Sequence, residues 1–158
     1  MDTVVREARS AEERAACWAI REAVFIREQG IAEDLERDGL DEIARHLVAW
    51  QEDRRAIGTA RVLALDADRR PVPPEQGEVA KIGRMAVLLA ERRRGVGRVL
   101  LDAALDLARL HGIAHAELSA QEYVVEFYEK FGFRVEGEPY LEAGIPHRRM
   151  TRKLWGGS

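Results

Sequence analysis

Residues 79–112 carry the pattern that most restricts how this chain can fold: a strand, a turn rich in arginine and glycine, and a long helix. The turn spans residues 92–98 and has the sequence RRRGVGR. After Gly95, apolar residues recur every three or four positions as far as Ala108, and Gly112 follows as the expected helix end. Together with the strands on either side, this unit predicts a mixed α/β domain.

The turn at 92–98 has the composition of an anion-binding site. Gly95 and Gly97 let the backbone approach a ligand, and the first N–H groups of the following helix have no partner within it. These groups, the helix dipole and four arginines would together favour a pyrophosphate. The turn is neither a Walker loop, which needs Gly-Lys-Ser/Thr, nor a dinucleotide fingerprint, which needs a third glycine. An ordinary tight turn with solvated arginines is the alternative.

Composition narrows the class of protein further. The chain has 158 residues, 46% of them hydrophobic, so a single folded domain is expected. No apolar run approaches the ~18 residues of a membrane span, and the acidic N-terminus is unlike a signal peptide. We therefore expect a cytoplasmic protein with no membrane partner. The net charge of −3 disfavours a nucleic-acid partner, and the lone Cys17 rules out an internal disulfide or a cysteine-rich zinc site; no metal is expected.

Hydrophobic periodicity and turn residues predict about seven strands and four helices. The expected strands are residues 3–7, 47–50, 57–65, 79–89, 115–119, a strand starting at 133–136, and 147–154. The expected helical segments are a capped helix from 10 to about 29, a short turn in the acidic stretch after it, 95–112 and 122–130. Residues 53–55 are a predicted hairpin turn, 66–76 a loop, and 156–158 a frayed tail.

A second motif, FYEKFGF at residues 127–133, follows the first. The RxxGxG pattern at 92–97 and this motif together resemble the signature of the GNAT (N-acetyltransferase) superfamily. Residues 21–29, 82–87, 120–121 and 144–147 further resemble its ElaA-type branch. The resemblance implies a GNAT domain over residues 1–155: a central mixed, mostly antiparallel twisted sheet of about seven strands with two splayed parallel central strands, flanked by about four helices.

The resemblance also implies an N-acetyltransferase that moves an acyl group from acyl-CoA, with acetyl-CoA as co-substrate, to a primary amine by direct attack in a ternary complex. The cofactor would lie where the strands 79–89 and 115–119 splay apart. Its arm would bind the strand backbone like an added strand, and its pyrophosphate would bind the turn. The expected cofactor-binding residues are Met85, Ala86, Val87, Arg92, Arg93, Arg94, Gly95, Val96, Gly97, Arg98 and Tyr128.

Catalytic roles are less sharply defined. Tyr128 matches the tyrosine that protonates the departing thiolate in many relatives, although it could also belong to an aromatic core. Some relatives carry a glutamate as general base where this chain has Lys81. The remaining candidate bases are His147, His46 and Glu28 acting through water, and ordered water alone is a further alternative. We predict Tyr128 and His147 as the catalytic residues.

The acceptor should bind among the first helix, residues 30–42 and a loop at 139–147. The predicted substrate-binding residues are Phe25, Glu28, Gln29 and His46. Seven acids in residues 28–42 would attract a cationic small-molecule or peptide amine, or would simply keep a loop solvated.

Two other functions stay open: a non-catalytic acyl-CoA-binding sensor, and an acyltransferase resembling acyl-homoserine-lactone synthases. The bulky Met85 and Leu88 favour a short acyl group, which speaks against the second. The sequence is compatible with a homodimer, and it does not identify the acceptor.

Overall fold

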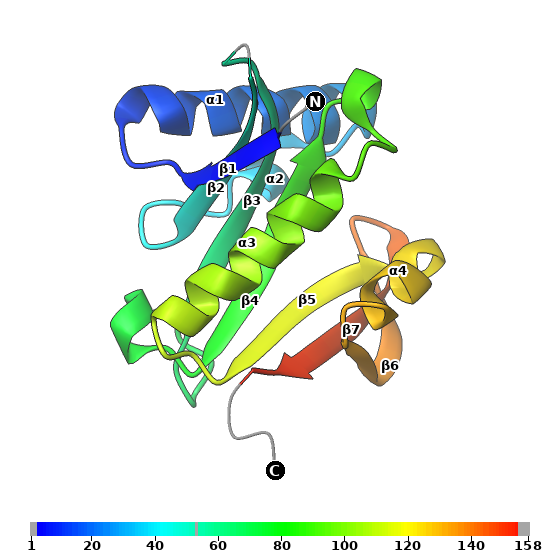
Figure 1. The fold of residues 1–158 in the computed structure, drawn as a ribbon. Coiled ribbons are helices and arrows are strands. Elements are labelled where there is room, and N and C mark those ends of the chain that lie inside the picture. Colours follow the sequence, from blue (N-terminus) through cyan, green and yellow to red (C-terminus); the bar gives the residue numbers. More distant parts are fainter. Residues whose placement is uncertain (1–2, 53, 155–158) are drawn as a thin grey trace.

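The computed structural model describes residues 3–52 and 54–154, which form one seven-stranded sheet with helices on both faces (Figure 1). The strand order is β1-β2-β3-β4-β5-β7-β6. The strands are β1 (Thr3–Glu7), β2 (Arg45–Gln51), β3 (Ala56–Leu65), β4 (Val79–Val87), β5 (His115–Gln121), β6 (Arg134–Glu142) and β7 (Ile145–Lys153). Neighbouring strands in this sheet are antiparallel except for β4 and β5, which run parallel. The predicted mixed, mostly antiparallel sheet is confirmed.

Four α-helices accompany the sheet in the described residues, as the sequence predicts. They are α1 (Ala11–Arg21), α2 (Glu33–Glu36), α3 (Val96–Leu110) and α4 (Val125–Glu129), with a π-helix η1 (Glu22–Glu28) and short 3₁₀ turns η2 (Pro74–Gln76), η3 (Leu89–Glu91) and η4 (Glu122–Val124). The capping box at the start of α1 is present: the Ser10 hydroxyl accepts from the Glu13 N–H, and the Glu13 carboxylate accepts from the Ser10 N–H, both at 3.0 Å. No helix in residues 3–52 or 54–154 is long and apolar enough to cross a lipid bilayer.

Some element boundaries differ from the prediction. The first helix is α-helical only to Arg21 and then widens into the π-helix η1. β4 ends at Val87 instead of residue 89, whereas β2 and β5 extend beyond their predicted ends. The loop predicted at 139–147 is wrong, because β6 and β7 form a hairpin there. Its proline, glycine and glutamates are uncommon in strands and conceal the pairing. Residue 53 of the predicted turn and the tail at 156–158 lie outside the described residues.

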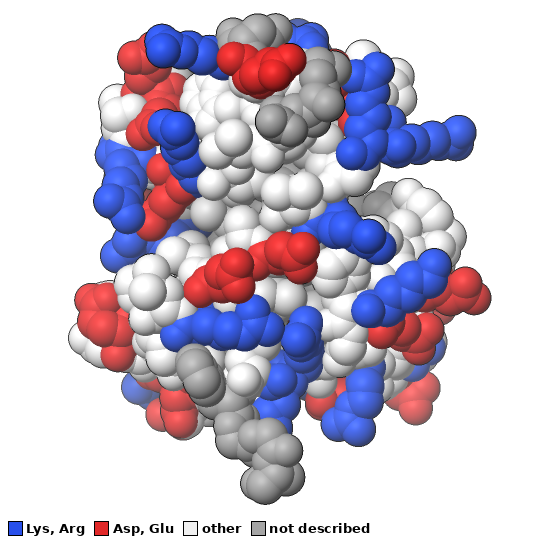
Figure 2. All heavy atoms as spheres, in the orientation of Figure 1, with Lys and Arg blue, Asp and Glu red and all other residues white. Residues whose placement is uncertain are grey.

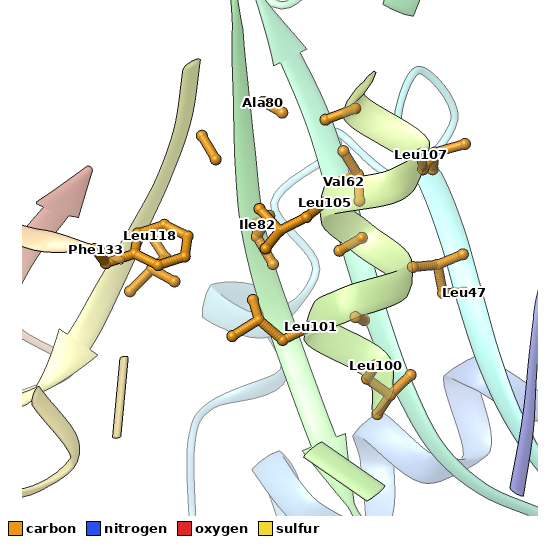
Figure 3. Packing of buried hydrophobic residues seen from close by; sticks show 14 of the residues in the cluster. Leu47, Val62, Ala80, Ile82, Leu100, Leu101, Leu105, Leu107, Leu118 and Phe133 are labelled. Carbon is orange, nitrogen blue, oxygen red and sulfur yellow. The ribbon is translucent and has the colours of Figure 1, made fainter. Parts of the chain in front are cut away.

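Helix α3 forms the main core with one face of the sheet. Its buried Leu101 and Leu105 pack with Val62 of β3 and Ile82 of β4, while Leu118 of β5 lies on the other side of the space between β4 and β5 (Figure 3). Gly58 of β3 allows the start of the helix to approach closely. A Cβ at that position would lie 3.0 Å from Leu100 Cδ1. Close packing therefore fixes the N-terminus of α3 beside β3 and β4.

Helix α1 packs on the opposite face of the sheet (Figure 1). Its buried Cys17 belongs to a small hydrophobic cluster with Val48 of β2. Its Ile20 belongs to another such cluster with Ala86 of β4. Burial raises the pKa of the Cys17 thiol, as expected for a core residue with no reactive role. Residues of η1 and α2 border the space between β4 and β5.

Candidate active site

The two parallel strands β4 and β5 separate part-way along their length (Figure 1). Their pairing runs from Val79 with His115 to Ile82 with Leu118, although both strands continue beyond these residues. A β-bulge bends β4 at the same point, with Arg84 in the left-handed region at φ 49°. Beyond Ile82, the edge of β4 that faces β5 therefore lacks a partner strand in the described sheet.

A cavity of about 540 Å³ opens at this separation. Its lining includes five of the residues predicted for the site, which come from η1 and the residue that ends it, β4, α4 and β7: Phe25, Gln29, Met85, Tyr128 and His147. The side chains of Ala86 and Val87 lie outside this lining, although their backbone continues the unpaired edge of β4. The structure thus brings together residues that are about 120 positions apart in the sequence.

The turn before α3 presents backbone N–H groups without a side-chain cap. Gly95 is the N-cap residue at φ 82°, and no side chain of the described residues caps this end. The N–H groups of Val96, Gly97 and Arg98 therefore begin the helix without intrahelical partners. Figure 2 shows Lys and Arg side chains extending at the upper right, where this turn lies in Figure 1.

The four arginines of the turn differ in whether they already have partners within the protein. Arg92 donates to the Val87 carbonyl at 2.9 Å and to both carboxylate oxygens of Glu28 at 2.6 and 2.7 Å. Arg94 pairs with Glu91 at 3.4 Å. Arg93 and Arg98 have no carboxylate partner among the described residues, and Arg98 lies 5.7 Å from the ring centre of Phe131. Two arginines therefore organise the turn, and two remain available to an anion.

Tyr128 lies on α4, half-buried, with its ring 5.1 Å from that of Phe127 and 6.2 Å from that of Phe133. It packs in the aromatic cluster and also lines the cavity, so its place in the core does not exclude it from the site. Burial raises the pKa of its phenol. The hydroxyl therefore stays protonated at neutral pH and can act as a proton donor.

His147 is buried on β7 and belongs to a polar cluster at the β6–β7 hairpin. Its Nδ1 lies 2.7 Å from the Ile145 carbonyl, and its Nε2 lies 3.6 Å from a carboxylate oxygen of Glu142. Ser119 of β5 bonds to both Tyr140 and Glu142. The sequence does not predict that Ser119 and Glu142 lie together, because it predicts a loop at 139–147 where the structure has the β6–β7 hairpin.

Comparison with known proteins identifies the family. The sequence pattern of the acetyltransferase (GNAT) domain matches residues 10–154. The chain belongs to the GNAT acetyltransferase family. It is an N-acetyltransferase of this family, and protein ElaA of Escherichia coli is 34% identical over 147 residues, which cover 92% of this chain and 90% of ElaA. The resemblance to the ElaA-type branch is confirmed.

Solved GNAT structures share the fold. The crystal structure of E. coli ElaA superposes with a TM-score of 0.80 at 30% identity, covering 96% of this chain and 99% of that one. An acyl-CoA N-acyltransferase of Pseudomonas aeruginosa gives 0.77 at 31% identity, covering 96% and 98%. An N-acetylglutamate synthase of Neisseria gonorrhoeae, solved with coenzyme A and N-acetyl-glutamate, gives 0.70 at 20% identity, covering 98% and 36%. This last likeness concerns the fold alone.

Beside the cavity of this GNAT enzyme, three arginines and three carboxylates alternate in a closed ring. The charge ring runs Arg21–Glu36–Arg84–Asp38–Arg61–Asp41 and back to Arg21, with N–O distances between 2.8 and 3.2 Å. It ties α2 and the segment after it to α1, β3 and β4. Burial acts to raise the pKa of Asp38, but the hydrogen bonds from Arg61 and the Leu40 N–H, together with the charges of Arg61 and Arg84, hold that pKa well below its usual range.

The acidic stretch is therefore not the surplus of negative charge that the sequence suggests. Three of its seven acids belong to the charge ring, Glu28 is bound to Arg92, and Glu33 lies 3.5 Å from Arg37. Since each of these carboxylates already faces a guanidinium, little uncompensated charge remains to attract a cation.

The structure does not bring His46 into the cavity. Its ring is 3% exposed, its Nε2 lies 2.8 Å from the Asp41 carbonyl, and Trp18 packs edge-on at 4.7 Å. Burial lowers its pKa, so the imidazole stays neutral. The predicted role of His46 in substrate binding is not supported. The residue lies outside the cavity lining, and its ring contacts the backbone of Asp41, a member of the charge ring. Glu28 also lies outside the cavity lining.

Proposed function

We propose that this enzyme transfers a short acyl group, the acetyl group in the simplest case, from acyl-CoA to a primary amine within a ternary complex. The observation that carries the proposal is the separation of β4 and β5 beside the uncapped start of α3. An unpaired strand edge can accept an extended amide-containing arm, and a helix N-terminus can accept a diphosphate. Pantetheine diphosphate combines these two chemistries at one end of a molecule.

The residues present fit coenzyme A. The N–H groups of Val96, Gly97 and Arg98 would hold the diphosphate, with Arg93 and Arg98 as unpaired cations nearby. A Cβ at Gly97 would contact nothing within 4 Å, so space for a ligand exists against this backbone. The N. gonorrhoeae relative of the same fold, solved with coenzyme A, supports this assignment.

The chemistry requires one proton donor and one proton acceptor. When the amine nitrogen attacks the thioester carbonyl, a new C–N bond forms, the C–S bond breaks, and the sulfur leaves as a thiolate. Tyr128 lines the cavity as a protonated phenol and would donate its proton to that sulfur as negative charge develops on it. His147 would accept a proton from the amine, and Glu142 at 3.6 Å would stabilise the resulting imidazolium.

Glu28 is a poor alternative base. Its hydrogen bonds to Arg92 lower its pKa, and a carboxylate held by two short bonds accepts a further proton reluctantly. His46 is buried outside the cavity. His147 is therefore the base that we propose, with ordered water as the alternative. A small-molecule or peptide amine as acceptor, and a location in the cytoplasm, stay predictions.

Ligand-induced stabilisation and free-thiol release together test the proposal. Acetyl-CoA at ~100 times its dissociation constant should stabilise the fold by ~2.7 kcal/mol, measured as a thermal shift. The variant Gly97→Glu places a carboxylate at the proposed diphosphate site and should abolish the shift. Leu110→Glu adds the same charge at the exposed far end of α3 and should retain it. The absence of a shift with any acyl-CoA would contradict the proposal, and binding without thiol release from any amine would favour a sensor.

A further inference from the structure

Some of the charged side chains that line the cavity are paired with opposite charges, and others are not. Arg61, Arg84, Glu36 and Asp38 all line it, and all four belong to the charge ring, where each charge faces opposite charges within 3.2 Å. Their charges are thus compensated by one another. The charges that remain in the lining are those of Lys81 and Glu142. These two determine what charge the cavity would prefer in a substrate.

Lys81 is an exposed cation at this lining, with no carboxylate partner in the described part of the chain. It lies on β4 opposite Glu117 of β5, which would be the obvious partner for it. Glu117, however, is bound by Arg69 at 2.6 Å and by Arg149 at 3.0 Å. Within residues 3–52 and 54–154, no ion pair or hydrogen bond engages the Lys81 ammonium. An ammonium that lines a cavity without a carboxylate favours an anionic group in whatever fills that cavity.

The other charge in the lining, Glu142, lies on β6, beside Ser119 of β5. Glu142 bonds to Ser119 and lies 3.6 Å from His147. Ser119 is two residues along β5 from Glu117, so Lys81, Glu117 and Ser119 extend from the same face of the sheet. An ammonium group of a substrate would be stabilised near Glu142, and a carboxylate of the same substrate would be stabilised near Lys81. The lining therefore has the polarity of a zwitterion.

We infer that the acceptor carries a carboxylate besides its amine, and that Lys81 binds this carboxylate. The inference rests on the proposed acyl transfer and names the class of its acceptor: an α-amino acid, or a compound that carries an amine and a carboxylate at similar spacing. Lys81 is a specificity-determining residue in this account and takes no part in proton transfer. The dicationic amines that the acid count favours are predicted to be poor acceptors, because five of those seven acids already face an arginine, three of them in the charge ring.

Matched acceptors test the inference on the intact protein. Thiol release from acetyl-CoA is measured with a panel of L-amino acids, with their carboxamides, and with the corresponding decarboxylated amines. The carboxylates should exceed the other two series by about tenfold or more in kcat/KM, the effect expected of one added charge-assisted contact. The preference should appear mainly as a lower KM, because the carboxylate takes no part in the bonds that form and break and its contact with Lys81 contributes equally to the bound substrate and the transition state.

Two variants assign that preference to Lys81. Lys81→Met keeps the length of the side chain and should reduce the carboxylate preference to near parity, while the thermal shift with acetyl-CoA stays unchanged. Lys81→Glu should reverse the preference in favour of the carboxamides, because they lack the carboxylate that the introduced negative charge would repel. Lys153→Met removes an exposed lysine at the end of β7 and serves as the matched control. It should leave the preference as it is.

The outcomes separate this inference from the proposed function. Equal kcat/KM for carboxylates and carboxamides, or a preference that survives in Lys81→Met, would overturn the inference while acyl transfer stands. If no amine in the panel is acetylated, the same compounds are tested for stabilising the CoA-bound protein. A larger thermal shift from carboxylates, lost in Lys81→Met, would then support the role of Lys81, and equal shifts would overturn it.

Discussion

The proposed cofactor side, at β4 and the start of α3, and the proposed acceptor side, at the charge ring beside the cavity, use different parts of the chain. On the cofactor side, the strand edge of β4 and the start of α3 offer backbone groups, and several side chains there are exposed or hold the turn together. On the acceptor side, the charge ring consists of side chains that bind one another. A backbone site tolerates most side-chain changes, whereas a ring of paired charges depends on every member. The cofactor side is thus built for a constant ligand and the acceptor side for a particular one.

The largest expected effect lies where the two sides meet, at Tyr128. Tyr128→Phe removes one hydroxyl and little packing, so the thermal shift with acetyl-CoA should persist. If the phenol protonates the thiolate, kcat should fall by about 10²–10⁴-fold, or about 3–5 kcal/mol in the barrier. Steady-state thiol release measures it, with the loss in kcat more than in KM.

Tyr123→Phe is the matched control for this experiment. Tyr123 also lines the cavity, but its side chain is 82% exposed and packs against little. Its hydroxyl can be removed at almost no cost to packing, so Tyr123→Phe should turn over at nearly the wild-type rate. A Tyr128→Phe variant as fast as the wild type would return Tyr128 to the aromatic core and leave water or His147 as the proton donor.

Breaking the charge ring should have the next largest effect, on stability. Arg61→Met keeps much of the volume of a buried side chain but removes the guanidinium that binds Asp38 at 2.8 Å and Asp41 at 3.1 Å. Removing one member of a buried ion pair typically costs 3–5 kcal/mol. Because Arg21 and Arg84 still bind these two carboxylates, we expect about 3 kcal/mol, measured by urea unfolding.

The same variant should separate the two sides of the cavity functionally. Acetyl-CoA should still stabilise Arg61→Met, because the ring lies away from α3, while the KM for the acceptor should rise. Arg109→Met, which breaks the exposed pair with Asp106 on α3, should cost less than about 1 kcal/mol. A comparable loss in both variants would mean that the ring contributes no more than a surface pair.

The sequence predicts the strand, turn and helix of residues 79–112 well and the pairing of the charged residues in the ring poorly, for one physical reason. The strand, turn and helix of residues 79–112 are contiguous, so glycine placement and a 3.6-residue period are enough to find them. Tyr128 was found through a motif of the same local kind. The charge ring joins positions 21 and 84, and no local pattern reports which acid faces which arginine. The acid count in residues 28–42 therefore overstated the free negative charge.

The same reason explains the two errors of local structure. The π-helix η1 differs from an α-helix by a slight widening that apolar periodicity does not detect, yet it places Phe25 and Gln29 in the cavity lining. The β6–β7 hairpin contains residues with little strand preference and is held by pairing with β5 through β7. In both places tertiary contacts, which the sequence does not display, decided the outcome.

The smallest predicted effect concerns a contact that joins the two sides. Glu28, at the end of η1, binds Arg92, which also holds the Val87 carbonyl before the turn. Glu28→Gln removes a negative charge beside the proposed diphosphate site and loosens the end of the π-helix that carries Phe25. Affinity for coenzyme A should therefore rise a few-fold, while the KM for the acceptor rises by a similar factor.

Calorimetric titration of coenzyme A and acceptor kinetics measure these two changes separately. Glu22→Gln is the matched control, because Glu22 lies on the same π-helix and its pair with Arg27, at 3.6 Å, is exposed and distant from the turn. It should change neither quantity. If coenzyme A binds more tightly and the acceptor more weakly in Glu28→Gln alone, the ion pair between Glu28 and Arg92 favours acceptor binding at the expense of coenzyme A binding. If both affinities fall together, the contact serves only to hold the turn in place, and the two sides would then be coupled through the backbone of β4.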